Sequence, residues 1–224
     1  MIAAIYTPDG IVLSTLGVDY FYQSSDDNCV NRIEIIGHRH IINFWGQYVL
    51  MFHQADEYRL EGNIIDILEN VKTRWPDTIP QIHELMPYIK KQIIDYDLHL
   101  IGVMAGYSLS KDNKREQFVY QILGKEIRRI NTNNDGEITY NCVFFEKETV
   151  IGRILRDVKV RNGEEWEELS PIQLRCDLYS IHKAREVANY LLRAAHYLKN
   201  INSSYTQNYD VESVVIMSNE ILIE

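Results

Sequence analysis

The sequence predicts an α+β protein built as a four-layer αββα sandwich, in which two stacked antiparallel β-sheets each carry a helical layer on the outside. The first observation behind this prediction is the order of elements: strands, two helices, strands, further helices and a last pair of strands. The second is that each expected helix has one apolar face, which must be buried against a sheet. Helices between blocks of antiparallel strands are typical of two sheets packed on each other. Because no repeat or linker interrupts the chain, we expect a single domain over residues 1–224.

The first half of the chain supplies one block of strands and two helices. It opens with apolar runs at residues 2–6 and 11–13, and the turn sequence Pro8-Asp9-Gly10 between them predicts a β-hairpin. The next strands are expected at residues 32–35, 40–45 and 48–52. Apolar residues then recur at near-helical spacing, which predicts a helix at residues 55–75, ended by Pro76, and a second helix at residues 79–94.

The second half supplies the other strands, the longest helix and the closing strand pair. Strands are expected at residues 98–104, 118–123, 126–130, 138–145, 211–217 and 220–223. A turn rich in Asn, Asp and Gly at residues 133–136 separates two of them. We expect a short helix at residues 148–157, a charged loop around residues 161–165, and the longest helix at residues 178–199.

Composition limits the partners and the compartment. The net charge is −9 and the basic residues are interleaved with acids, whereas nucleic-acid binding needs clustered Lys and Arg, so no nucleic-acid partner is expected. No apolar run approaches the ~20 residues that span a bilayer, and the apolar start lacks a basic flank, so neither a membrane anchor nor a signal peptide is expected. The three cysteines, Cys29, Cys142 and Cys176, form no Cys-x-x-Cys pair, which favours a reducing cytoplasm.

Five segments carry a resemblance to a known family. They are the hairpin at residues 2–13, the strand pair ending at Gly46, the strand ending in Ala105-Gly106-Tyr107, the helix start at residues 178–184, and the strand pair at residues 211–223. Their order and spacing resemble the proteasome β-type subunits, including the bacterial HslV-type peptidases. The resemblance covers nearly the whole chain and implies an N-terminal-nucleophile hydrolase fold.

In that family the side chain of residue one attacks an amide and its own α-amino group acts as general base. A lysine lowers the pKa of the amine, an aspartate orders the lysine, and a glycine amide donates to the oxyanion.

This sequence departs from the family pattern at most of these positions. Met1 replaces the nucleophile, and a bulky residue follows it, which disfavours ordinary methionine removal. Arg32 occupies the lysine position but cannot serve as a tunable base. The aspartate position falls at residues 16–17, which are Leu and Gly, with Asp19 two residues beyond. Only Gly46 matches the family.

Two other motifs are candidate metal sites. His38 and His40 lie two residues apart, so a strand places both imidazoles on one face, but a third ligand is not evident and a surface hairpin is the simpler interpretation. Residues 131–138 resemble the start of a calcium loop, but its twelfth position is Cys142, so a hairpin turn explains them better. No phosphate loop or dinucleotide fingerprint occurs, and we expect no metal and no cofactor.

Three functions follow from these expectations. The preferred hypothesis is a proteasome-like protein without the nucleophile, non-catalytic, with an assembly or binding role and self-association as a homo-oligomer. The second is an amide hydrolase or peptidase activated by processing that makes Thr7, Ser14 or Thr15 residue one. The third is small-molecule binding in the vacated cleft, where Arg32 beside Gly46 would hold a carboxylate or phosphate.

Overall fold

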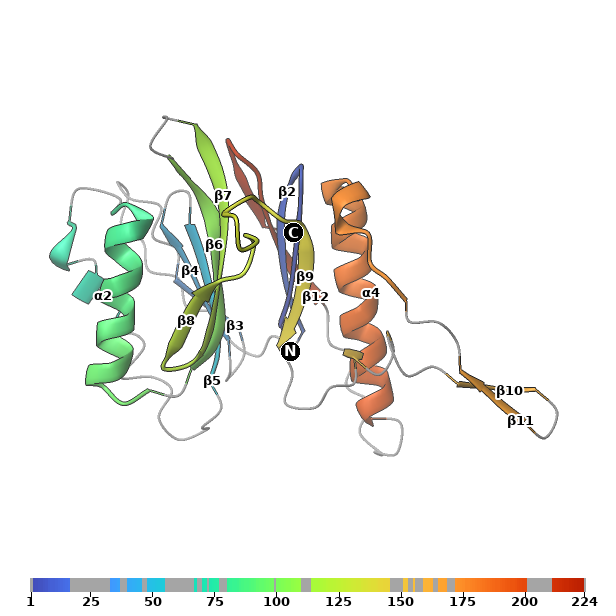
Figure 1. The fold of residues 1–224 in the computed structure, drawn as a ribbon. Helices are drawn as coiled ribbons and strands as arrows, with labels where there is room; N and C mark the ends of the chain where they lie inside the picture. The colour runs from blue at the N-terminus through green and yellow to red at the C-terminus, as the bar shows by residue number, and fades with distance from the viewer. Residues whose placement is uncertain are drawn as a thin grey trace.

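The structure is a computed structural model, and it confirms the predicted fold class. It describes residues 2–16, 33–36, 40–45, 48–54, 67, 70–71, 73–76, 80–98, 100–109, 114–145, 151–152, 155, 159–162, 165–168, 172–200 and 211–223. Two antiparallel sheets are stacked face to face, with the helix α2 (Ile82–Asp95) outside one and the helix α4 (Ile181–Asn200) outside the other (Figure 1).

One sheet joins the two ends of the chain. In the described residues it has five strands in the order β13-β12-β2-β1-β9, and we call it the five-stranded sheet. Its strands are β1 (Ile2–Thr7), β2 (Gly10–Leu16), β9 (Asn141–Phe145), β12 (Val211–Ile216) and β13 (Ile221–Ile223). The predicted hairpin at the start of the chain is β1–β2, and β1 is a central strand because β9 pairs with its other edge.

The other sheet is built from consecutive segments of the chain. Among the described residues it has six strands in sequence order, and we call it the six-stranded sheet. Its strands are β3 (Ile33–Ile36), β4 (His40–Trp45), β5 (Tyr48–Gln54), β6 (Leu100–Leu109), β7 (Arg115–Gly124) and β8 (Glu126–Arg129). Local hairpin pairing therefore sets the register of every neighbouring pair except β5 and β6, between which the chain forms α2.

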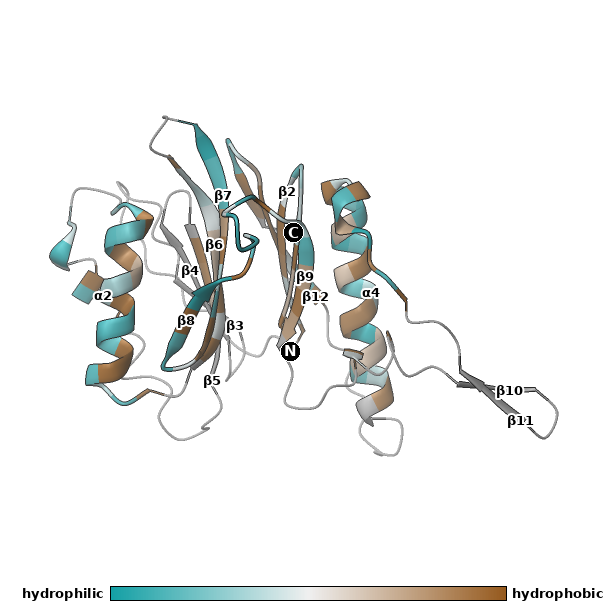
Figure 2. Cartoon of the chain, viewed as in Figure 1, coloured by the Kyte–Doolittle hydropathy of each residue, from teal (hydrophilic) through white to brown (hydrophobic). Residues whose placement is uncertain are grey.

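Three buried clusters fill the spaces between the four layers. One packs α2 onto the six-stranded sheet through Leu85, Ile89 and Ile93, all fully buried. A second lies between the sheets, and a third packs α4 onto the five-stranded sheet. Both helices carry hydrophobic and hydrophilic residues (Figure 2), as expected for helices with one buried face.

The backbone of β2 at Gly10 lies very close to the backbone of β12. A Cβ at Gly10 would lie 2.5 Å from the carbonyl oxygen of Ile216, which is directly alongside on β12. A side chain at this position would therefore collide with backbone. The turn sequence at residues 8–10 thus serves close strand approach as well as chain reversal.

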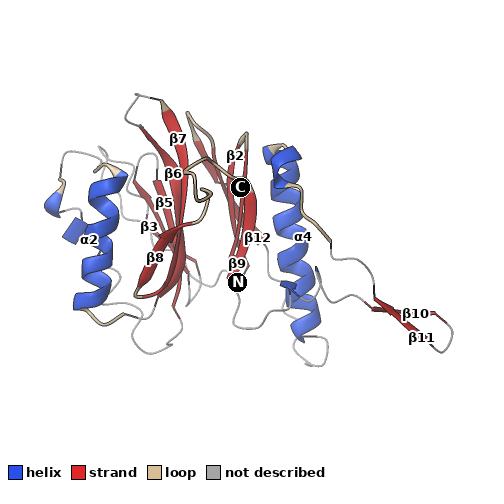
Figure 3. Cartoon of the chain, in the orientation of Figure 1, coloured by secondary structure: helices blue, strands red, loops and turns tan. Residues whose placement is uncertain are grey.

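The clearest departure from the sequence prediction is a projecting hairpin. A charged loop was expected around residues 161–165, but residues 161 and 162 lie in β10 (Lys159–Asn162) and residue 165 begins β11 (Glu165–Glu168), and these two strands pair with each other. These strands form a separate sheet that lies away from the layered body (Figure 3). The prediction was wrong at residues 161, 162 and 165, because backbone pairing between strands does not require an apolar pattern.

Other boundaries differ by a few residues. β6 continues to Leu109 rather than ending at residue 104, and α4 begins at Ile181 after the short 3-10 helix η2 (Cys176–Leu178). Of the two remaining expected helices, residues 67, 70–71 and 73–74 and residues 151–152 and 155 are helical, and the rest lie outside the described residues.

Within the described part of the chain, none of the helices combines the length and apolar character required to cross a bilayer.

Candidate functional site

The resemblance locates the family's nucleophile at the start of β1, so that edge of the sandwich is the first candidate site. Across the five-stranded sheet, Ile2 is in register with Phe145 on one side and Thr15 on the other, and Thr15 is in register with Glu212. Ile2 belongs to the cluster between the sheets, as do Leu13 on β2 and Val214 on β12. Because side chains alternate along a strand, Thr15 and Glu212 face the same space.

This edge combines a hydroxyl and a carboxylate in an otherwise apolar setting. Ile2 and Thr15 are fully buried and Glu212 is half-buried. Sequence reasoning missed Glu212, since nothing near it in the sequence links it to β1. The pairing of β12 with β2 is what places it two strands from Ile2.

The residues predicted from the family pattern fall mostly outside the described residues. This applies to Met1, Asp19, Arg32 and Gly46, so their roles remain predictions. In the sequence, Met1 directly precedes β1 and Arg32 directly precedes β3.

Of residues 16 and 17, where the family's aspartate is expected, the structure describes Leu16. Leu16 is buried and in register with Val211, and it shares the face of β2 that carries Val12 toward α4. An apolar, packed side chain therefore lies close to where the resemblance predicts the family's aspartate.

The candidate metal ligands are only partly covered by the structure. His38 lies outside the described residues, while His40 begins β4 and is in register with His53 on β5. Both histidines therefore lie in strands of the six-stranded sheet. The described residues contain no group of three or more His, Cys, Asp or Glu side chains able to hold a metal ion.

A polar cluster occupies the opposite end of the space between the sheets, near the β1–β2 turn. Gln117 is buried, and its Nε2 donates to the carbonyl oxygen of Thr7 at 3.1 Å and to the hydroxyl of Tyr107 at 3.3 Å. Its Oε1 is buried and has no hydrogen-bond partner among the residues that the structure describes. The Tyr6 hydroxyl donates to the carbonyl oxygen of Ile130 at 3.3 Å. Burial raises the pKa of both tyrosines, so both hydroxyls stay protonated near neutral pH.

Asn131 ties this cluster to the six-stranded sheet. It is fully buried, its Oδ1 accepts from the backbone N–H of Val119 at 2.9 Å, and its Nδ2 donates to the carbonyl oxygen of Gln117 at 2.9 Å. Arg129 adds a hydrogen bond to Asn131 Oδ1 and an ion pair with Glu116 at 2.5 Å.

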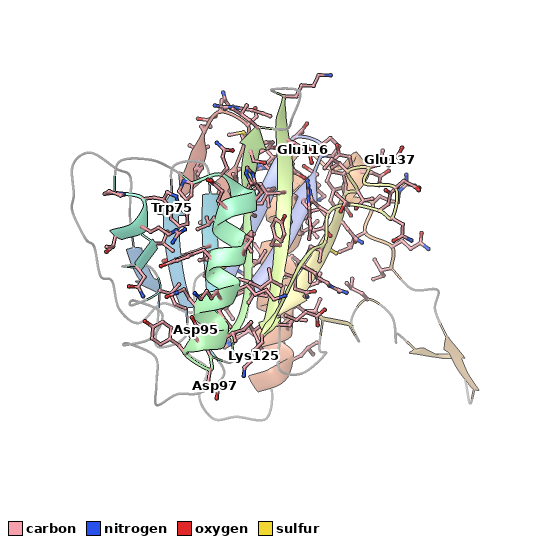
Figure 4. The ribbon with its side chains drawn as sticks, turned by 60° about the vertical axis from the view of Figure 1, so that its left-hand side comes forward. Trp75, Asp95, Asp97, Glu116, Lys125 and Glu137 are labelled. Carbon is pink, nitrogen blue, oxygen red and sulfur yellow. The ribbon has the colours of Figure 1, made fainter. Side chains whose placement is uncertain are left out.

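Glu116 and Glu137 lie toward one end of the sandwich, while Asp97 and Lys125, which form an ion pair at 2.5 Å, lie at the other (Figure 4).

The layer between the five-stranded sheet and α4 holds a second buried polar group. The hydroxyls of Ser14 and Ser213 are 2.9 Å apart, and Ser213 donates to Asn189 Oδ1 on α4 at 2.9 Å. These hydrogen bonds satisfy the hydroxyls inside the core. An activated serine needs a neighbouring general base, and an amide oxygen is not one.

Comparisons with known proteins support the fold. No protein-family model matches the chain, and no curated protein matches it. Two solved structures are similar to this chain over 99% of its length. One is a mutant of Anbu from Hyphomicrobium sp. strain MC1, with 11% sequence identity, a TM-score of 0.57 and 83% of that protein covered. The other is Anbu, an ancestral β-subunit, from Yersinia bercovieri, with 10% sequence identity, a TM-score of 0.53 and 85% of that protein covered. At such low identity the likeness shows the fold alone. The chain has the fold of the proteasome-like N-terminal-nucleophile hydrolases.

Proposed function

We propose that this chain is a non-catalytic, proteasome-like protein that acts by associating with copies of itself. The observation that carries the proposal is the identity and burial of the residues around the start of β1. Met1 and Ile2 offer a thioether and a hydrocarbon, neither of which attacks an amide, and Leu16 is packed close to where the resemblance predicts the family's aspartate.

The alternative hydrolase is disfavoured by where its nucleophiles lie. Thr7, Ser14 and Thr15 are all fully buried within β1 and β2. Thr7 Oγ1 donates to the carbonyl oxygen of Gly10 at 3.2 Å, and the Ser14 hydroxyl is hydrogen-bonded to the Ser213 hydroxyl. Cleavage before Thr7 would remove most of β1, which is paired on both edges, and cleavage before Ser14 or Thr15 would remove β1 entirely.

The exposed face of α4 supports self-association. Tyr190 and Tyr197 lie two turns apart on this helix and are 70% and 65% exposed. Large exposed aromatic side chains in line are typical of interface anchors. Glu186 and Arg193 lie about one turn on either side of Tyr190, so two α4 helices packed antiparallel around a two-fold axis near Tyr190 would set the Glu186 carboxylate against Arg193 of the partner subunit.

The test separates catalysis from assembly. The protein from its native host is examined by intact mass and N-terminal sequencing, and is then treated with a covalent probe for N-terminal nucleophiles. We expect no labelling. Labelling of a Thr, Ser or Cys at a processed N-terminus would overturn the non-catalytic part of the proposal.

Assembly is measured by size-exclusion chromatography with light scattering at micromolar concentration. We expect a multiple of the monomer mass for the wild type and a shift toward monomer for Tyr190→Glu combined with Tyr197→Glu. Tyr140→Glu, an exposed tyrosine next to β9, is the matched control and should leave the mass unchanged. A strict monomer for the wild type would refute self-association.

A further inference from the structure

Two cysteines that are far apart in the sequence meet in the layer beneath α4. Cys142 lies on β9 in register with Ile5, and Cys176 begins η2. Both belong to the packed region that joins the five-stranded sheet to α4, and η2 contacts both β1 and β9. The Cys142 side chain hydrogen-bonds to the thiol of Cys176, and no disulfide joins these two described residues.

The two thiols differ in exposure and reactivity. Cys176 is 1% exposed, whereas Cys142 is only half-buried. The hydrogen bond with Cys142 lowers the pKa of the Cys176 thiol, although burial and Asp177 act in the opposite direction. A lowered pKa makes the thiolate, which is the nucleophile, more available.

We propose that Cys142 and Cys176 form a redox couple that closes to an internal disulfide when the chain meets a low-molecular-weight disulfide such as glutathione disulfide. The half-buried Cys142 thiolate attacks one glutathione sulfur, which forms a mixed disulfide and releases one glutathione thiolate. The Cys176 thiolate then attacks Sγ of Cys142, forms the Sγ–Sγ bond and releases the second glutathione thiolate. Two protein thiols are oxidised, one glutathione disulfide is reduced, and the two thiol protons leave with the two glutathiones.

The bond would close the chain between β9 and η2. This segment, residues 143–175, contains the projecting β10–β11 hairpin (Figure 1). Oxidation would therefore attach the end of this segment, at Cys176, covalently to β9 of the five-stranded sheet. A cross-link that closes a loop of this length restricts the unfolded chain and stabilises the folded one.

The experiment uses the full chain, treated with glutathione disulfide while folded, then alkylated, digested and mapped by mass spectrometry. We expect a peptide that links Cys142 to Cys176 and an unfolding midpoint that rises by about 5 to 15 °C. Cys29→Ser, the matched control, should form the same link.

Two single variants test the order of attack. Cys176→Ser should accumulate glutathione on Cys142, while Cys142→Ser should leave the buried Cys176 unmodified. Cys176→Ala is the second variant if the serine disturbs folding. The proposal fails if the wild type keeps both thiols alkylatable after treatment, if the link forms only in urea, if Cys29 is the partner, or if oxidation lowers the midpoint.

Discussion

Asn131 uses both ends of its side chain to hold the segment that follows β8 against β7, at the polar end of the space between the sheets. Its oxygen accepts from Val119 and its nitrogen donates to Gln117, both on β7. The sequence pattern marks residues 133–136 as a turn, which the structure confirms through hydrogen bonds from Gly136 N to the carbonyl oxygen of Asn133 and from Asn133 N to that of Glu137. The burial of Asn131 has no such local signal, because asparagine is usually exposed.

We expect Asn131→Ala to lower the free energy of unfolding by about 2–3 kcal/mol, because the substitution leaves the buried N–H of Val119 without its partner and removes one of the two hydrogen bonds to the carbonyl oxygen of Gln117, which also accepts from Arg129. Urea denaturation at pH 7 measures the change. Asn134→Ala, in the exposed turn three residues away, is the control and should change stability by less than about 0.5 kcal/mol. Equal effects of the two variants would show that the Asn131 hydrogen bonds do not stabilise the fold.

Tyr6 makes the free energy of unfolding depend on pH in the alkaline range. Burial raises the pKa of Tyr6 above its value of about 10 in the unfolded chain, so the folded state favours the protonated hydroxyl. The stabilising contribution is complete below pH about 10 and is lost as the pH rises from there toward the folded-state pKa. We expect Tyr6→Phe to reduce the fall in stability between pH 9 and pH 11, measured by urea denaturation at each pH. A difference from wild type that stays constant over this range would contradict the prediction.

At the scale of elements, Gly10 and Gly136 both lie at turns, but the structure requires a glycine at each for a different reason. Gly10 is held close to the backbone of β12, whereas Gly136 has a φ of 83° and open space around it. The sequence identifies both as turn glycines and cannot distinguish them, since the crowding at Gly10 comes from a strand that follows about 200 residues later.

We expect Gly10→Ala to destabilise the protein by about 3 kcal/mol, because the new methyl group overlaps a carbonyl oxygen that belongs to a paired strand. Gly136→Ala should cost about 1 kcal/mol, the price of a left-handed backbone for an L-residue. Thermal unfolding of both variants gives the comparison. A milder effect at Gly10 than at Gly136 would mean that β12 shifts to accept the methyl group.

Strands set by local turns and strands set by distant partners differ in how well they can be predicted. The six-stranded sheet follows sequence order, and its expected strands are confirmed with boundaries that differ by a few residues. The row of Phe145, Ile2, Thr15 and Glu212 crosses four strands from three distant parts of the chain. No local pattern encodes that register, so the hydroxyl and carboxylate beside Ile2 emerge only from the folded arrangement.

At the scale of the whole molecule, the layers share strands and cores so closely that we expect a single unfolding unit. β1 and β2 contribute side chains both to the cluster between the sheets and to the cluster beneath α4. Differential scanning calorimetry should show one transition with a ratio of calorimetric to van't Hoff enthalpy near 1. Two resolved transitions would contradict the single domain over residues 1–224.

A variant with residues 160–167 replaced by a short Gly-Ser turn should keep the single transition, because that hairpin pairs with neither large sheet.

The strand order of the five-stranded sheet also bears on how the protein is made. β2 pairs with β1 on one edge and with β12 on the other, and β12 begins only at Val211. At 5–20 residues per second, a ribosome needs on the order of 10 to 40 s to extend the chain from β2 to β12. During that interval the nascent β1–β2 hairpin exposes an apolar edge that its own chain cannot yet cover, and such edges recruit foreign strands. We infer that this protein depends more on chaperones during synthesis than during refolding, when β12 is present from the start.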